Sequence, residues 1–312
     1  MRIGWIVPGY QGREDEPGIP ALTGLARELA RDHDLRVYAV RFPLRNQEYS
    51  VDGVSVIGFG TAPAMGNRFQ WRAGSVVRWT RVLRALHVAH RRAPFAVLHG
   101  FWATEAGMLA AVGGRLLGVP VAVSVCGGEF ASVRSVGYGN QLNRFERAQV
   151  ALSLHLADRI GVGSDDTRSR LIARYPLLEA RIVNLPLGFD PMLFTPAPAT
   201  APPGTLVCVA SWSAVKGHAL LLDAMRLLRA WGSPVRLTLI GERTDSAEAR
   251  RAVAERGLED WVDLLGYQSQ ARVAEVLGRA RVSAMASWHE AQCLAIVESL
   301  ARGIPVVATP VG

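Results

Sequence analysis

Residues 282–312 read VSAMASWHEAQCLAIVESLARGIPVVATPVG. The first six residues are typical of a short buried strand, and the apolar spacing of LAIVESLARG, residues 294–303, predicts a helix that faces the core. Gly303 stands where a glycine commonly ends a helix, and the run IPVVAT that follows is typical of a parallel strand covered on both faces. This stretch therefore predicts one βαβ unit.

Two glutamates flank the start of the predicted helix. Glu290 is expected in the loop at the carboxyl end of a strand, where open α/β sheets bind ligands, and Glu298 within the helix. The backbone N–H groups of residues 291–294 can donate into the same crevice. Since carboxylates accept hydrogen bonds from sugar hydroxyls, the pair predicts a polyol site. The alternative is that Glu290 is only an acidic residue favoured by the helix dipole at the helix start, and that Glu298 is a solvated helix residue.

Composition describes a soluble globular protein. The chain has 312 residues, 49% hydrophobic and 20% charged, which is long enough for two domains. Its apolar runs are too short to span a bilayer, and the N-terminus resembles no secretory signal. The widely separated Cys126, Cys208 and Cys293 argue against a disulfide framework or a zinc site and indicate a reducing cytoplasm.

The charge balance points to an anionic partner. Net charge is +8, and of 35 basic residues only Lys216 is a lysine. A compact ammonium suits a phosphate, so this lysine is a candidate phosphate ligand. The arginines are dispersed and no RNA-binding aromatic motif occurs, which argues against a nucleic acid partner.

The N-terminal half alternates predicted strands and helices, among them a strand over residues 51–59 and a helix over residues 140–157. Its first loop, PGYQGREDEPG, lacks GxGxxG spacing, which disfavours a nicotinamide-dependent enzyme; Gly18 could admit a ligand to the backbone or simply form a turn. His99, on the predicted strand 95–102, and Glu129, in the glycine turn GGEF with Gly128, are candidates for a site at the strand ends. A structural role is the alternative for each.

Residues 76–92 predict a basic amphipathic helix. Its apolar arc holds Trp79, Val82, Leu83, Leu86 and Ala89, and the opposite arc holds Arg78, Arg81, Arg84, Arg91 and Arg92. Such a helix can lie on anionic lipid headgroups. The alternative is an ordinary surface helix with solvated arginines.

A proline-rich stretch, residues 196–204, predicts a linker between two domains, 1–195 and 205–312. The second block has five predicted strands alternating with helices, and Lys216 is expected to open the helix after the first of them. The ammonium and that helix N-terminus could hold a diphosphate. The predicted fold class is α/β, with two Rossmann-like domains facing across a cleft.

With these positions placed, the chain resembles the retaining glycosyltransferases of family 4, which have the GT-B architecture. HEAQCLAIVESLARGIPVVATPVG is similar to the family's signature of two glutamates separated by seven residues, and VASWSAVKGHALLLDAM to its lysine-glycine segment for the donor diphosphate. NLPLGFDPMLFTP resembles the end of the family's N-terminal domain, and GGEF its turn with His-Gly-x-Asp.

The resemblance implies a hexosyltransferase that takes a nucleotide sugar, with retention of configuration and no metal, to a glycan or lipid-linked acceptor in cell envelope polysaccharide synthesis. Glu290 with the amides of Gln292 and Cys293 would contact the sugar, Glu298 the ribose, and Lys216 with Gly217 the diphosphate. Ser211 and Leu294 would belong to the same donor site, and Gly18, His99, Gly128 and Glu129 to the acceptor side. The implied location is cytoplasmic or peripheral on the inner face of the cell membrane.

The sequence departs from the family at three points. Ser211 replaces a common arginine, Cys126 a common histidine, and the chain stops at VATPVG, so we expect an incomplete second domain. A degenerate protein that binds a nucleotide sugar or a partner without turnover is therefore the alternative function.

Overall fold

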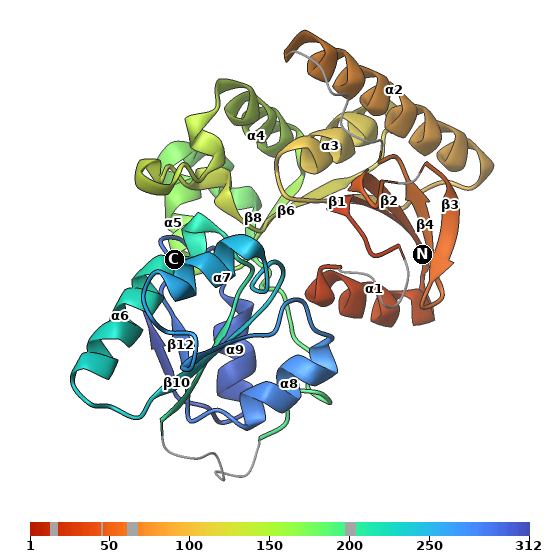
Figure 1. Ribbon diagram of the computed structural model, residues 1–312. Coiled ribbons are helices and arrows are strands. Elements are labelled where there is room, and N and C mark those ends of the chain that lie inside the picture. Colours follow the sequence, from red (N-terminus) through yellow and green to blue (C-terminus); the bar gives the residue numbers. More distant parts are fainter. Residues whose placement is uncertain (13–17, 45, 61–67, 197–203) are drawn as a thin grey trace. The chain divides into compact units, whose positions relative to one another are not determined.

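The computed structural model describes residues 1–12, 18–44, 46–60, 68–196 and 204–312, without side chains for 68–73. The chain divides into two compact units (Figure 1). The first comprises Met1–Ser132 and Gly139–Leu187, and the second Val133–Tyr138 and Gly188–Gly312. Both are α/β, as predicted, and no described helix is long and apolar enough to cross a membrane.

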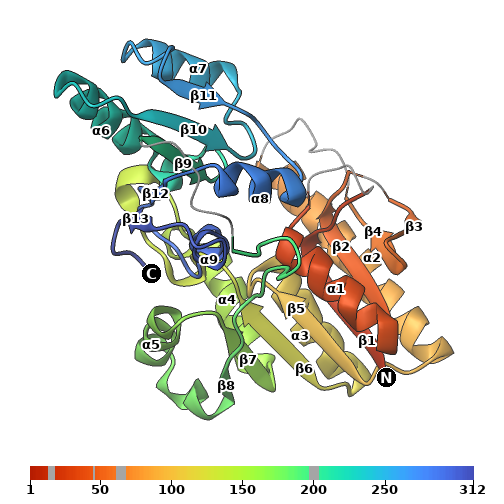
Figure 2. The same cartoon turned by 90° about the horizontal axis from the view of Figure 1, so that it is seen from below.

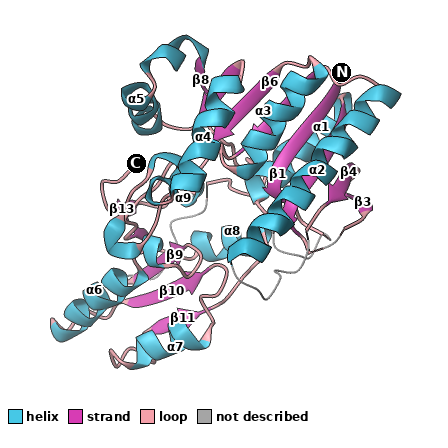
Figure 3. Cartoon of the chain, turned by 90° about the horizontal axis from the view of Figure 1, so that it is seen from above, coloured by secondary structure: helices cyan, strands magenta, loops and turns pink. Residues whose placement is uncertain are grey.

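The first unit is built on a sheet in the order β3-β4-β2-β1-β5-β6-β7-β8, parallel except for the edge strand β3. Helices flank the strands, as Figure 3 shows. The strands are β1 (Arg2–Gly9), β2 (Asp34–Phe42), β3 (Glu48–Val51), β4 (Val54–Gly58), β5 (Val97–Phe101), β6 (Val121–Val125), β7 (Arg159–Val162) and β8 (Ile182–Asn184). The helices are α1 (Pro20–Asp32), α2 (Arg68–Arg92), α3 (Glu105–Leu117), α4 (Arg144–Leu156) and α5 (Asp165–Arg174).

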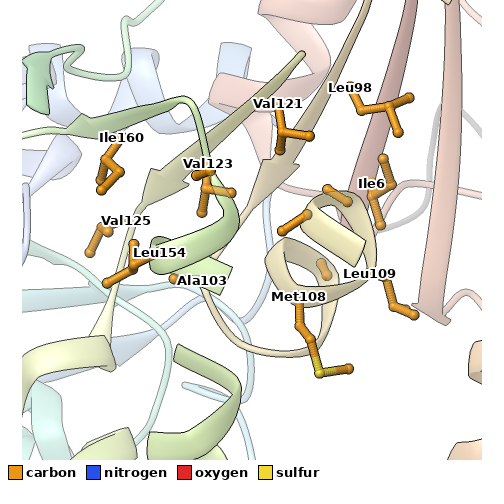
Figure 4. Packing of buried hydrophobic residues seen from close by; sticks show 14 of the residues in the cluster. Ile6, Leu98, Ala103, Met108, Leu109, Val121, Val123, Val125, Leu154 and Ile160 are labelled. Atoms are coloured by element: carbon orange, nitrogen blue, oxygen red, sulfur yellow. The ribbon is translucent and has the colours of Figure 1, made fainter. Parts of the chain in front are cut away.

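Alternation along β1 produces two cores. Ile6 packs with Leu98, Leu109 and Val121 on the face covered by α3, the packing drawn in Figure 4. Trp5 and Val7 point to the other face, where they join Leu22 and Ala26 of α1. A parallel strand covered on both faces reads as a continuous apolar run, which is why these strands were recognisable in the sequence.

The second unit has a five-stranded parallel sheet in the order β11-β10-β9-β12-β13. Helices α6 and α7 pack on one face and α8 on the other (Figure 2). The strands are β9 (Thr205–Val209), β10 (Arg236–Ile240), β11 (Val262–Leu264), β12 (Val282–Met285) and β13 (Val306–Ala308). The helices are α6 (His218–Ala230), α7 (Ala247–Ala254), α8 (Gln270–Gly278) and α9 (Leu294–Ala301).

Several predicted boundaries need correction. The strand expected over 51–59 is a hairpin, because Asp52 and Gly53 have positive φ (49° and 77°) and turn the chain between β3 and β4. The helix expected from Asn140 begins at Arg144, since the Asn143 side chain caps it. Lys216 ends a 3₁₀ turn, Ala214–Lys216, and α6 begins two residues later.

The domain boundary also lies earlier than residue 195. Phe189, Leu193 and Phe194 pack with Val207 and Ile240 of the second sheet, so residues from Gly188 onward cluster with the second unit. Most of the expected linker, 197–203, lies outside the described residues.

The basic helix α2 is tied to the first unit by one glutamate. Glu105 is buried and accepts hydrogen bonds from Arg78 (Nη2, 2.6 Å), the Trp79 indole and Arg41. Two guanidiniums hold the pKa of this carboxyl below its usual range despite burial. Arg78, expected on the arc opposite the apolar one, is therefore a partly buried partner, because α3 presents a carboxylate to it.

This ion pair predicts a large stability effect. Glu105→Ala leaves the partly buried Arg78 without its carboxylate, and we expect a loss of about 3 kcal/mol in the free energy of unfolding measured by urea denaturation. Glu28→Ala, which removes an exposed partner of Arg31, is the matched control, with an expected change below about 0.5 kcal/mol. Equal effects for the two variants would contradict the assignment.

Candidate functional site

Lys216 and Glu290 form an ion pair at the carboxyl edge of the second sheet. Lys216 follows β9 and Glu290 follows β12, and these strands are neighbours in the sheet, so residues far apart in sequence meet. Lys216 Nζ lies 2.8 Å from Glu290 Oε1 and 3.0 Å from Oε2. The side chains are 26% and 12% exposed, so the pair is partly open to solvent at this edge of the sheet.

Gly217 makes this approach possible. Its φ is +66°, and a Cβ at this position would lie 1.9 Å from the Ala286 carbonyl oxygen. The adjacent loops are also joined by a hydrogen bond from Trp288 N to the Val215 carbonyl, at 2.7 Å. Only glycine allows the lysine turn to lie directly on the β12 loop.

Two hydroxyl side chains that the sequence reasoning did not single out hold Glu290. Ser287 Oγ donates to Glu290 Oε1 at 2.6 Å, and Thr309 Oγ1 donates to the Ser287 carbonyl at 2.6 Å. Thr309 N donates to the Met285 carbonyl, which links the end of β13 to the same loop. The signal in the sequence was that each is the last residue of a predicted strand.

Glu298 is the fifth residue of α9 and is 8% exposed. Among the described residues its carboxylate has no hydrogen bond or ion pair, and burial raises its pKa to about 7. A buried carboxylate without partners is costly, so this group is available to accept hydrogen bonds from a ligand.

The remaining donor-side candidates lie around the same loops. Gln292, Cys293 and Leu294 are partly buried at the start of α9, and the Cys293 carbonyl accepts from Ile296 N at 3.1 Å. Burial raises the pKa of the Cys293 thiol to about 11, so it stays neutral. Ser211 is exposed just after β9.

In the first unit, Glu129 is an interior anchor rather than an exposed acid. It is fully buried, and its carboxylate accepts from the amides of Ala103 (3.1 Å), Cys126 (3.2 Å) and Gly127 (2.8 Å). Burial raises its pKa. The expected acceptor contact of Glu129 is corrected to holding the turn that contains Gly128, because no face of the carboxylate is open.

His99 is partly buried in the first unit. It is the middle residue of β5, stacks on Phe101 with ring centroids 4.1 Å apart, and its Nε2 lies 2.9 Å from Ser124 Oγ. Burial lowers its pKa to about 4, so the ring is neutral at pH 7. His99 therefore lies in the middle of β5 and not at the strand terminus, and its acceptor-side role stays a prediction. Gly18 lies beside Gln11, where a Cβ would be 3.1 Å from the Gln11 Cβ.

No group of three or more His, Cys, Asp or Glu side chains that could hold a metal ion occurs among the described residues.

Comparison with known families agrees with this architecture. Residues 19–188 match the glycosyl transferase 4-like domain, and residues 197–312 match the glycosyl transferases group 1 model. The chain belongs to this family of GT-B glycosyltransferases, as the sequence motifs predicted.

Two curated relatives indicate the range of the family. The chain is 28% identical over 203 residues to the GDP-mannose:cellobiosyl-diphosphopolyprenol alpha-mannosyltransferase of Xanthomonas campestris, covering 62% of this chain and 50% of that protein. It is 32% identical over 169 residues to a D-inositol 3-phosphate glycosyltransferase of Pseudarthrobacter chlorophenolicus, covering 50% and 40%. The chain thus spans half or less of the length of these relatives.

Solved structures share the fold. Anabaena HepE in complex with UDP and glucose is similar with a TM-score of 0.71 and 19% identity, covering 100% of this chain and 81% of that one. Sucrose-phosphate synthase from Thermosynechococcus elongatus has a TM-score of 0.73 and 20% identity, covering 100% and 82%. These similarities confirm the predicted GT-B fold.

The buried Glu298 predicts a pH-dependent stability effect. Because its pKa is about 7 in the folded chain and 4.5 ordinarily, the protonated form stabilises the fold, and this stabilisation is lost as pH rises from 4.5 through 7. Glu298→Gln should therefore raise the free energy of unfolding by about 2 kcal/mol at pH 8 and far less at pH 5. Exposed Glu259→Gln is the control. A gain independent of pH would contradict the assignment.

Proposed function

We propose that the protein transfers a hexose from a nucleotide-sugar donor to a glycan or lipid-linked acceptor with retention of configuration. The observation that carries this proposal is the Lys216–Glu290 pair at the carboxyl ends of β9 and β12. The helix that follows, α9, holds the buried Glu298, whose carboxylate has no partner among the described residues. Family membership and the signature of two glutamates support the same reading.

A nucleotide-sugar donor consists of a nucleoside, a diphosphate and a sugar, and each of these parts has a suitable binding residue here. Lys216 binds the diphosphate and stabilises the charge that develops as it departs, an electrostatic role that commonly dominates catalysis. Glu290, held by Ser287, and the amides of Gln292 and Cys293 bind hydroxyls of the transferred sugar. Glu298 accepts hydrogen bonds from the ribose. Ser211, Gly217 and Leu294 line the same site, and the transfer uses no resident metal.

The acceptor is proposed to bind the first unit around Gly18 and Gly128. The relatives named above act on a diphosphopolyprenol-linked sugar and on an inositol phosphate, and both acceptors carry phosphate. A lipid-linked acceptor for cell envelope polysaccharide would place the protein at the cytoplasmic face of the membrane.

Helix α2 is the proposed membrane-facing element. Val82 and Leu86 of its predicted apolar arc are fully buried, and Arg84, Arg91 and Arg92 are exposed. Val76, Val77 and Val88 are exposed as well, so cationic and apolar side chains are both outward. This combination suits anionic headgroups, and Arg78 is excluded from it by its bond to Glu105.

Nucleotide binding tests the donor site. We expect UDP, GDP or ADP to bind in calorimetry, with affinity falling about tenfold in Lys216→Ala. Affinity should increase as pH rises through about 7, because the Glu298 carboxylate must ionise to accept the ribose hydroxyls. Glu298→Gln should flatten this pH dependence. Unchanged binding in both variants would refute the site.

Vesicle binding tests α2. Replacing Arg84, Arg91 and Arg92 with Gln should abolish most of the salt-sensitive binding to phosphatidylglycerol-rich vesicles measured by flotation. The matched control replaces the exposed Arg144, Arg147 and Arg159 of the same unit and should retain binding. Equal losses in the two triple variants would show a general charge effect and contradict the assignment.

Turnover separates the enzyme from a non-catalytic binder. Transfer or donor hydrolysis by the purified chain, with NMR of the product anomer, is the expected result and would also establish retention. Nucleotide binding without either activity would favour the degenerate nucleotide-sugar-binding protein.

A further inference from the structure

The charge balance of the donor site leaves a diphosphate short of cations. Lys216 is engaged by both oxygens of Glu290, so this ion pair carries no net charge. Glu298 adds a second acidic group on the adjacent helix. A nucleotide diphosphate is an anion, and Ser211, which follows β9, brings no charge. A further cation at this edge of the sheet would balance the charge of a diphosphate.

Arg243 is a candidate for this cation at the carboxyl edge of the second sheet. It lies in the loop after β10, the strand beside β9, and its side chain is 61% exposed. Its φ of +64° is in the left-handed region, which an arginine adopts at a cost that glycine avoids. Such conformations persist where surrounding structure enforces them and are concentrated at functional sites.

The surrounding hydrogen bonds do enforce it. Trp212 N donates to the Glu242 carbonyl at 2.8 Å, and Gly241 N to the Gly266 carbonyl at 2.9 Å. The fully buried Thr244 donates from Oγ1 to the Gly241 carbonyl at 3.0 Å and accepts from Gly266 N at 3.0 Å. The loops after β9, β10 and β11 are thus bonded together around Arg243.

Close backbone packing fixes the same loop against β9. A Cβ on Gly241 would lie 2.4 Å from the Ala210 carbonyl oxygen and 2.9 Å from Ser211 N. The loop that carries Arg243 therefore lies directly on the segment that leads to Lys216, at the carboxyl edge where open α/β sheets bind ligands.

The present partner of Arg243 is easily exchanged. Arg243 Nη2 lies 3.1 Å from Glu248 Oε2 on the first turn of α7, and both side chains are more than half exposed. Exposed ion pairs contribute little, whereas a guanidinium binds phosphate oxygens with two parallel hydrogen bonds.

We propose that Arg243 binds the diphosphate of the nucleotide-sugar donor. Its guanidinium supplies a positive charge that is needed because Glu290 neutralises the charge of Lys216. This inference rests on the proposed function, since it adds a residue to the same donor site. Glu248 holds the guanidinium until the diphosphate replaces it.

Calorimetry on the full chain with UDP, GDP and ADP, and with the corresponding monophosphates, tests the proposal. Arg243→Gly removes the guanidinium and relieves the left-handed backbone, so we expect about tenfold weaker diphosphate binding without a lower melting temperature. The loss should be smaller for monophosphates. Glu248→Gln should bind diphosphates as tightly as the unmodified chain or more tightly.

The control is Arg251→Ala, which removes an exposed arginine of α7 paired with Glu255, and diphosphate affinity should stay within about twofold. Unchanged affinity in Arg243→Gly, or equal losses in Arg243→Gly and Arg251→Ala, would overturn the role of Arg243 while leaving the donor site intact. Failure of all three diphosphates to bind the unmodified chain would instead overturn the proposed function, and this inference with it.

Discussion

The close approach of two loops in the second sheet is the constraint on which the candidate site depends. Gly217 has no Cβ, so the turn that carries Lys216 can lie against the Ala286 carbonyl. That contact brings the ammonium onto both oxygens of Glu290, and Ser287 and Thr309 fix the glutamate from the other side. A side chain at position 217 would separate the loops and disperse these groups.

Three buried glutamates show how differently one residue type can be stabilised. Glu105 is neutralised by arginines and joins α2 to α3, and Glu129 is bonded by three backbone amides of one turn. Both are therefore structural. Glu298 has no such partner among the described residues, and its pKa is raised. Burial of this carboxylate is unfavourable, and a bound polyol would offset that cost, so the contrast supports the proposal that Glu298 binds the donor.

The arginines of the chain likewise have different roles in the structure. Arg78 is used internally, while Arg84, Arg91 and Arg92 remain at the surface beside exposed valines. Arg243 is exposed, like many other arginines, and differs from them in its backbone. Buried hydrogen bonds hold that backbone in a left-handed conformation. Net charge alone could not distinguish these roles.

The sequence by itself determined the α/β class, most strands and helices, and the two signature glutamates, because apolar periodicity and the spacing of Glu290 and Glu298 are local properties of the chain. It also predicted Lys216 as a candidate phosphate ligand. Only the tertiary structure decided that Lys216 is bonded to Glu290, that Glu129 is fully buried, and that His99 packs on Phe101. It also decided that Ser287, Thr309 and Arg243 stand at the same sheet edge. These facts depend on strand order and loop packing, which bring together residues that no local pattern connects.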